Sequence, residues 1–244
     1  MLCVLLSGHI LRARPSPQDI FLVKEIARLL TEEESAFSES INFTERLNDV
    51  DAIIVSGNDK SGRYFQQYFG QKPHIIRQNL TSCGILTGNE IGEELKSLGG
   101  DIFQYFGLGS RNVSKLFVPP DYNFDTFFGA IQEYAAVIHH HKYSNNYDYN
   151  KSVYLVNQIP HLDNGFLLLT QNESLTSPTA VVYYETYQDV DELHRKMKQF
   201  SGNIQCIVSQ NGWFTGSIPF GEAQRPKVWD YAGGVDTMRF LLSL

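Results

Sequence analysis

The stretch GLGSRNVSKLFV, residues 107–118, decides how the rest of the chain is interpreted. Two glycines bring Ser110 to the tip of a turn, and the apolar run at residues 116–118 predicts a strand directly after it. Such a turn presents one side chain to a reacting atom, and here that side chain carries a hydroxyl. No Gly-x-Ser-x-Gly elbow surrounds it and the sequence assigns it no His or Asp partner. By spacing alone, Ser110 is therefore an ordinary turn residue.

Composition is that of a globular protein. The chain has 244 residues, 42% of them hydrophobic and 19% charged, which allows one large or two modest domains. The net charge of -7 argues against nucleic acid as a partner, because phosphate binding needs clustered Lys and Arg. No run approaches the roughly 18 apolar residues of a membrane span. The three cysteines do not form a recognisable disulfide framework, and the start of the chain does not resemble a signal peptide. Both observations predict a cytoplasmic protein.

Strands and helices alternate along the chain, which is typical of a parallel α/β sheet with crossover helices. The apolar run at 2–6 has the composition of a buried helix. The expected strands are 10–14, 51–57, 72–79, 82–88, 116–118, 152–159, 166–172, 179–187 and 204–210. The expected helices are 19–30, 61–70, 88–107, 121–141 and 189–200, with a loop at 143–150 and a final helix or strand near the C-terminus.

Two local patterns raise binding hypotheses. In DAIIVSGNDKSGR, residues 51–63, a strand leads into a loop containing Gly57 and Gly62, which opens a helix. Exposed N–H groups at a helix N-terminus attract anions, so the loop is either a phosphate loop or an ordinary tight turn. The histidine run at 139–141 would point three rings about 100° apart on a regular helix. We therefore expect a helix end there, with no metal site.

Taken together and in order, five segments resemble the aldehyde dehydrogenase superfamily, and within it the long-chain acyl-CoA reductase (LuxC-like) family. The resemblance covers essentially the whole chain. The family's strand that ends in a basic residue and Pro-Ser is resembled by LLSGHILRARPS. Its phosphate loop is resembled by SGNDKSGR, and its nucleophile loop is resembled by GLGSRNVSKLFV. LTSPTAVVYYETYQDVDEL resembles the segment around Phe-Gly-Pro, with Pro178 retained, and PFGEAQRPKVWDYAGGVDTMRFL resembles the C-terminal signature of the reductases.

The resemblance implies an aldehyde dehydrogenase-like α/β fold in three parts. A partial Rossmann-like NADP-binding domain would cover residues 1–78, and a catalytic, acyl-accepting α/β domain would cover 79–217. A C-terminal segment, 218–244, would pack back toward the cofactor domain. The implied partners are a long-chain acyl-CoA or an acyl-protein thioester, and a second copy in a possible homodimer.

The implied reaction is reduction of an acyl thioester to a fatty aldehyde through an acyl-enzyme, with NADP(H) as cofactor. Arg14 would pair with a ribose 2′-phosphate, and Pro17 stands where NAD-preferring relatives carry a ribose-binding Glu, which favours NADPH. Glu173 and the adjacent Ser174 fall at or beside the position where relatives hold the nicotinamide ribose with a Glu, and Glu173 is the residue assigned to that role. The other residues that the resemblance assigns to the cofactor are Ser16, Ser56, Gly57, Asn58 and Gly62.

The sequence departs from the family at its nucleophile. Ser110 replaces the cysteine, and a hydroxyl near neutral pH forms almost no alkoxide, so we expect acyl transfer to fall at least ~100-fold. Cys83 is an alternative nucleophile, but its strand context favours a buried structural thiol. The general-base Glu of classical aldehyde dehydrogenases has no match, which fits a reductase.

The chain also begins just after the segment that supplies an oxyanion-stabilising asparagine in the superfamily. An incomplete sheet would expose an edge strand and apolar faces. Two alternatives to an active reductase follow from these departures: a catalytically silent acyl-CoA or nucleotide-binding relative, and a truncated gene product.

Overall fold

The computed structural model describes residues 1–16, 20–57, 65–78 and 80–244. The chain divides into two compact units. The first comprises Met1–Arg77 and Gly234–Leu244, and the second comprises Gln78–Gly233. The second unit thus extends beyond residue 217, where the sequence analysis ended the acyl-accepting domain. The reason is local: the segment after residue 217 is hydrogen-bonded to that unit, as when Gly233 N–H donates to Gln205 Oε1.

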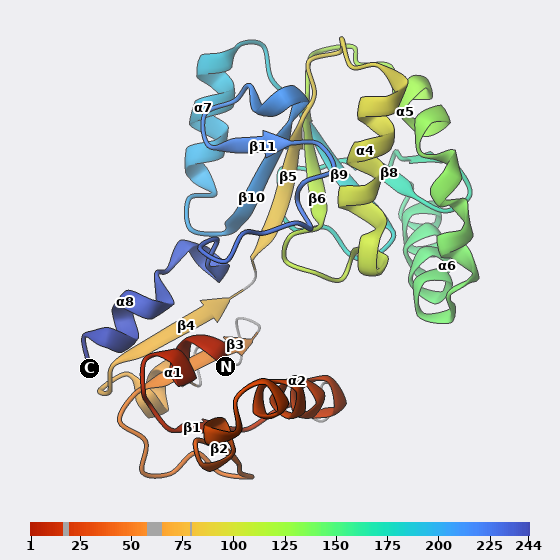
Figure 1. The fold of residues 1–244 in the computed structure, drawn as a ribbon. Helices are drawn as coiled ribbons and strands as arrows, with labels where there is room; N and C mark the ends of the chain where they lie inside the picture. Colours follow the sequence, from red (N-terminus) through yellow and green to blue (C-terminus); the bar gives the residue numbers. More distant parts are fainter. Residues whose placement is uncertain (17–19, 58–64, 79) are drawn as a thin grey trace. The chain divides into compact units, whose positions relative to one another are not determined.

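The second unit is built on a seven-stranded sheet of order β11-β10-β5-β6-β9-β8-β7 (Figure 1). Every neighbouring pair is parallel except β7 and β8, which form an antiparallel hairpin. The strands are β5 (Thr81–Ile85), β6 (Val113–Val118), β7 (Leu162–Asp163), β8 (Leu168–Gln171), β9 (Val181–Thr186), β10 (Ile204–Ser209) and β11 (Ser217–Pro219). This sheet confirms the predicted α/β class.

Helices cover both faces of the sheet, with α7 on one face and α4, α5 and α6 on the other (Figure 1). The α-helices are α4 (Gly92–Phe103), α5 (Asp125–Ala130), α6 (His141–Val156) and α7 (Val190–Gln199). The 3₁₀ segments are η2 (Gln104–Gly107), η3 (Gln132–His139), η4 (Gln210–Gly212) and η5 (Ala232–Gly234). The unit is therefore a three-layer α/β/α sandwich.

Alternation along the strands produces two separate cores. Side chains two residues apart point to the same face of a strand, so Cys83, Ile85 and Phe117 pack with Leu193 and other apolar side chains beneath α7. Leu116 and Val118 instead belong to the larger cluster beneath α4, α5 and α6. The central strands are apolar on both faces for this reason, and this is why they were recognisable as continuous apolar runs.

The first unit holds two pairs of short strands. β1 (Leu11–Ala13) pairs in parallel with β2 (Ile41–Phe43), and β3 (Ile53–Gly57) pairs with β4 (His74–Gln78). The remaining elements are α1 (Leu2–Leu6), α2 (Ile20–Glu33), η1 (Ser35–Glu39), a helical stretch at 65–69 and α8 (Thr237–Leu242). α1 contacts α8, and His9 Nε2 lies 2.9 Å from the carbonyl oxygen of Leu241. Large apolar side chains remain exposed on α2, where Phe21 is 84% exposed.

Helix α6 contradicts the loop expected at 143–150 and the strand expected at 152–159. Ser, Asn, Asp and Tyr are weak helix formers, so the local sequence favours other structures. The helix is stabilised instead by burial of Tyr143, Tyr147 and Tyr154, which recur on its inner side. Tyr143 also donates a hydrogen bond to the carbonyl of Phe166. Tertiary packing therefore decides this element.

The region 121–141, expected as one helix, contains α5, η3 and the first residue of α6. The helix expected at 88–107 is α4, which begins at Gly92, runs unbroken through Gly99 and Gly100, and ends at Phe103. A Cβ atom on Gly99 would lie 2.5 Å from a ring carbon of Tyr134, so this glycine permits close packing between α4 and η3. It does not interrupt the helix.

Candidate functional site

Ser110 lies at the exposed tip of the loop that joins η2 to β6. Before it, Tyr105, Phe106 and Gly107 all have positive φ angles, of 55°, 61° and 70°. The left-handed conformation is unfavourable for aromatic residues, so contacts elsewhere must hold the loop. One of these contacts is the ring of His140, which stacks on Phe106 at a centroid distance of 3.9 Å.

Asn112 provides the main anchor of this loop. Its side chain is buried, and its Oδ1 accepts a hydrogen bond of 2.8 Å from Gly109 N–H. Its Nδ2 donates to the carbonyls of Asp101, Ile102 and Gln104 at 2.9–3.2 Å. These carbonyls belong to the last turn of α4 and the residue after it, where helices leave acceptors unsatisfied. A single side chain thus caps a helix and fixes the Ser110 loop.

The surroundings of Ser110 provide no base. Its backbone carbonyl accepts a hydrogen bond of 3.0 Å from Ser82 Oγ, which lies 3.1 Å from Cys206 Sγ. Among the described residues no side chain hydrogen-bonds the Ser110 hydroxyl. Burial raises the pKa of the Cys206 thiol, so it does not supply a thiolate near neutral pH. The hydroxyl therefore has no activating partner of the kind that nucleophilic serines need.

Asp101 connects the Ser110 loop to the segment 221–223, which the sequence analysis placed in the C-terminal signature. Its carboxylate is fully buried and accepts hydrogen bonds from Gly221 N–H at 2.7 Å and Ala223 N–H at 3.0 Å. Arg111 Nε donates to the carbonyl of Ala223 from the other side. Burial raises the pKa of Asp101 to about 6, against the effect of these N–H donors.

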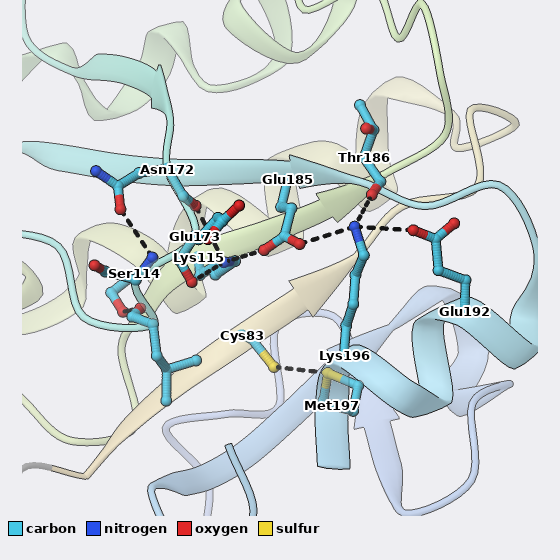
Figure 2. Close-up of polar contacts among 12 residues, drawn as sticks. Cys83, Ser114, Lys115, Asn172, Glu173, Glu185, Thr186, Glu192, Lys196 and Met197 are labelled. Carbon is cyan, nitrogen blue, oxygen red and sulfur yellow. Dashed lines mark hydrogen bonds and ion pairs between the residues drawn. The ribbon is translucent and has the colours of Figure 1, made fainter. Parts of the chain in front are cut away.

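A cluster of charged side chains joins the middle of β6, the carboxyl end of β9 and helix α7 (Figure 2); its members are Lys115, Glu185, Glu192 and Lys196. Lys115 Nζ lies 2.5 Å from Glu185 Oε2, and Lys196 Nζ lies 2.8 Å from Glu185 Oε1. Burial alone would raise the pKa of Glu185, but hydrogen bonds from both lysines hold it below its usual range. Burial lowers the pKa of Lys115, against the effect of Glu185. In the sequence, the sign of this cluster was one charged residue, Lys115, inside an apolar strand.

Glu173, the predicted ribose-binding residue, lies beside this cluster. Its side chain is exposed, and its backbone carbonyl accepts a hydrogen bond of 2.7 Å from Lys115 Nζ (Figure 2). It borders an open depression of about 600 Å³ at the carboxyl ends of β8 and β9. The other residues around this depression are Gln171, Asn172, Ser174, Glu185, Thr186 and Lys196. Ligands of open α/β sheets bind beyond the carboxyl ends of strands.

The predicted phosphate-binding residues lie in the first unit. Arg14, Ser16 and Ser56 line one cavity of about 1190 Å³, so the structure brings these three together. Gly57 ends β3, next to Ser56. Pro17, Asn58 and Gly62 lie outside the described residues. The structure therefore does not test the whole predicted set.

The same cavity carries an excess of positive charge in an acidic chain. Among the described residues, its basic lining residues are Arg12, Arg14, Lys24 and Arg46, against one carboxylate, Glu45. Arg12 donates to the backbone carbonyl of Asn48, whereas no described residue pairs with the guanidinium of Arg14. A cavity of this size and charge fits a phosphorylated nucleotide. Lys24 and Arg46 were not singled out in the sequence because nothing local marks them.

The histidine run is divided between two helices: His139 ends η3, His140 precedes α6, and His141 is its first residue. In the described part of the chain, no group of three or more His, Cys, Asp or Glu side chains is arranged to hold a metal ion. Nor does any helix there have the length and hydropathy needed to cross a membrane. Cys83 is completely buried, 4.0 Å from Met197 Sδ, as expected for a structural thiol.

No protein-family model matches the chain, and no curated protein matches it in sequence. Solved structures do match. A variant of proline utilization A from Bradyrhizobium japonicum superposes with a TM-score of 0.63 at 12% identity, over 85% of this chain and 26% of that one. Staphylococcus aureus AldH gives 0.56 at 15% identity, over 83% and 52%. An NAD-dependent aldehyde dehydrogenase from Sinorhizobium meliloti gives 0.63 at 9% identity, over 82% and 48%.

These similarities define the fold. The chain has an aldehyde dehydrogenase-like α/β fold and spans between about a quarter and a half of the length of these neighbours. Identities of 9–15% establish no more than the fold. The activity and the assignment to the LuxC-like branch therefore depend on arguments from the site.

Proposed function

We propose that this chain carries an acyl-accepting site of an NADP(H)-dependent acyl-CoA reductase, which converts a long-chain acyl thioester to a fatty aldehyde. The observation that supports this most is the construction of the Ser110 loop. The buried side chain of Asn112 hydrogen-bonds three carbonyls and one N–H, and these bonds hold the loop with position 110 at its exposed tip. An ordinary surface turn does not need such an anchor.

In the proposed reaction, the side chain at position 110 attacks the thioester carbonyl. A bond forms between that side chain and the acyl carbon, the carbon–sulfur bond breaks, and the thiol leaves with a proton. When bound, a nicotinamide cofactor would supply a hydride to the acyl carbon; the bond between that carbon and the side chain at position 110 would then break, the side chain would take up a proton, and the aldehyde would leave. With a serine and no neighbouring base, acyl transfer is at least ~100-fold slower than with cysteine, equivalent to roughly 2.7 kcal/mol of barrier.

The residues proposed to bind the phosphates and adenosine ribose of the cofactor are Arg14, Ser16, Ser56 and Gly57. Glu173 is proposed separately, as the residue that contacts the nicotinamide ribose. The guanidinium of Arg14 lines the cavity and has no partner among the described residues, which supports binding of a 2′-phosphate and hence NADPH over NADH.

A second candidate function is binding without turnover. It is favoured by one observation, the absence of an activating base for Ser110 among the described residues. In that case the chain would hold acyl-CoA or nucleotide through the same residues and would not form an acyl-enzyme.

The test is covalent labelling with a radiolabelled long-chain acyl-CoA, comparing the unaltered chain with Ser110→Cys and Ser110→Ala. We expect stable label on the cysteine variant, at least ~100-fold more slowly acquired label on the unaltered chain, and none on the alanine variant. NADPH should then release the label as aldehyde. Label on none of the three variants, together with measurable acyl-CoA binding, would favour the silent binding module. Neither label nor binding would refute both.

A further inference from the structure

Lys115 is a fully buried cation whose three ammonium protons match three oxygen acceptors. Its Nζ donates to the carbonyl of Asn172 at 3.1 Å, the carbonyl of Glu173 at 2.7 Å and Glu185 Oε2 at 2.5 Å (Figure 2). An ammonium group has three donors and no acceptor, so its hydrogen-bonding capacity is fully used. This geometry fixes the position of every group around it.

Two of these acceptors are successive carbonyls in an unusual connection. Residues 172–180 join the parallel neighbours β8 and β9 without a helix. Such a crossover lacks the internal hydrogen bonds of a helix, so its backbone must be held from outside. Lys115 holds Asn172 and Glu173, and Ser114 Oγ, next along β6, donates to the carbonyl of Leu175 at 2.9 Å. The backbone of Glu173 is thus fixed between two anchors on one strand.

The second oxygen of Glu185 is also occupied. Lys196 Nζ lies 2.8 Å from Glu185 Oε1 and donates to the carbonyl of Thr186 at 2.6 Å. Glu185 therefore cannot rotate away from Lys115 without losing a second ion pair. This arrangement makes Lys115 the centre of a rigid cluster.

Stability alone does not explain a lysine at this place. The ring centroids of Phe117 and Phe200 lie 5.2 and 5.1 Å from Lys115 Nζ, so the side chain has apolar neighbours that would also accommodate a methionine. Replacing buried ion pairs by apolar residues is often neutral for stability. An apolar residue could not, however, hold two successive carbonyls.

We propose that Lys115 is a positioning residue that fixes the Glu173 backbone, and so directs the Glu173 carboxylate toward the ribose of a bound nicotinamide nucleotide. This rests on the proposed function, in which Glu173 contacts that ribose. Lys115 itself stays buried and touches neither substrate nor cofactor. Its effect is on the affinity for the nucleotide.

The test measures NADPH affinity of the full chain by nucleotide fluorescence for Glu173→Gln, Lys115→Met and the double variant. Lys151→Met, which removes an ion pair with Asp163 elsewhere in the same unit, is the matched control. We expect each single variant to bind about 10-fold more weakly, the double variant to bind no more weakly than the worse single variant, and the control to be unchanged. Since Lys115→Met leaves Glu185 without one partner, Lys115→Arg serves as a second variant that keeps the charge.

The possible outcomes separate the two claims. If Glu173→Gln binds NADPH normally, or if the unaltered chain does not bind it, both the role of Glu173 and this inference are overturned. If Glu173→Gln weakens binding but Lys115→Met does not, only the inference fails. A double variant about 100-fold weaker would mean independent effects and would also overturn it. If Lys115→Met does not fold, Lys115→Arg must weaken NADPH binding at an unchanged melting temperature, and normal binding would overturn the inference.

Discussion

Replacing Asn112 by alanine removes the side chain that closes the Ser110 loop. The loss comprises one acceptor for Gly109 N–H and two amide protons shared among three carbonyls. That amounts to about three effective hydrogen bonds at ~1 kcal/mol each, because water cannot readily replace them at a buried position. We therefore expect a loss of about 3 kcal/mol of unfolding free energy, a large share of the 5–15 kcal/mol that is typical of a domain.

The assay is urea or thermal unfolding, with Asn146→Ala as the control. Asn146 is exposed on α6, and its Nδ2 makes one hydrogen bond, to the carbonyl of Lys142. The melting temperature of Asn112→Ala should fall by about 6–12 °C, and that of the control by about 2 °C or less. Amide exchange at Gly109 should accelerate in Asn112→Ala, because that N–H loses its acceptor. A stability loss below about 1 kcal/mol with Gly109 still protected would refute the role assigned to Asn112.

Three further predictions follow from burial and charge. The pKa of Asp101 is raised to about 6 in the folded chain, so ionisation of this carboxyl opposes folding. The stability that the protonated form contributes is fully present below the unfolded pKa and is lost as pH rises through about 6. Over this pH range the measured free energy of unfolding should fall by up to about 3 kcal/mol because of Asp101, and this fall should be absent in Asp101→Asn. Asp163 has a lowered pKa, so its ionisation should instead increase stability as pH rises. Cys83 should resist a thiol reagent at pH 8 until the chain is unfolded, since burial raises its pKa; labelling of the native chain would contradict this. Arg14→Ala should weaken NADPH binding about 10-fold and leave NADH binding unchanged, while Arg225→Ala should alter neither.

The fold was predictable where local pattern and tertiary environment agree. β5 and β6 are buried on both faces and β9 and β10 are half-buried to buried along their length, and an apolar run is enough to reveal such strands. Helix α6 was missed because it is stabilised by tyrosine side chains that are buried against the rest of the unit, while its own composition does not favour a helix. The role of Gly99 was also ambiguous in the sequence, since this glycine permits close packing of α4 against Tyr134 of η3 and does not end α4.

The candidate site was predictable only for residues that belong to contiguous motifs. Arg14, Ser16 and Ser56 were predicted from their strand-and-loop patterns; they line one cavity, and their role in cofactor binding stays a prediction. Asp101 was missed because its partners, Gly221 and Ala223, lie more than a hundred residues away in sequence. No local spacing signals a contact of that kind.

The two edge strands of the seven-stranded sheet have a consequence for assembly. β7 is two residues long and β11 is three, and β11 ends in Pro219, which has no N–H to donate. Long, flat edges allow another chain to add a strand, and short edges with proline resist this. Self-association through this sheet is therefore disfavoured, and the second unit is protected against fibril-like polymerisation. If the protein forms a homodimer, that dimer must use side-chain surfaces rather than a continuous sheet across two copies of this unit.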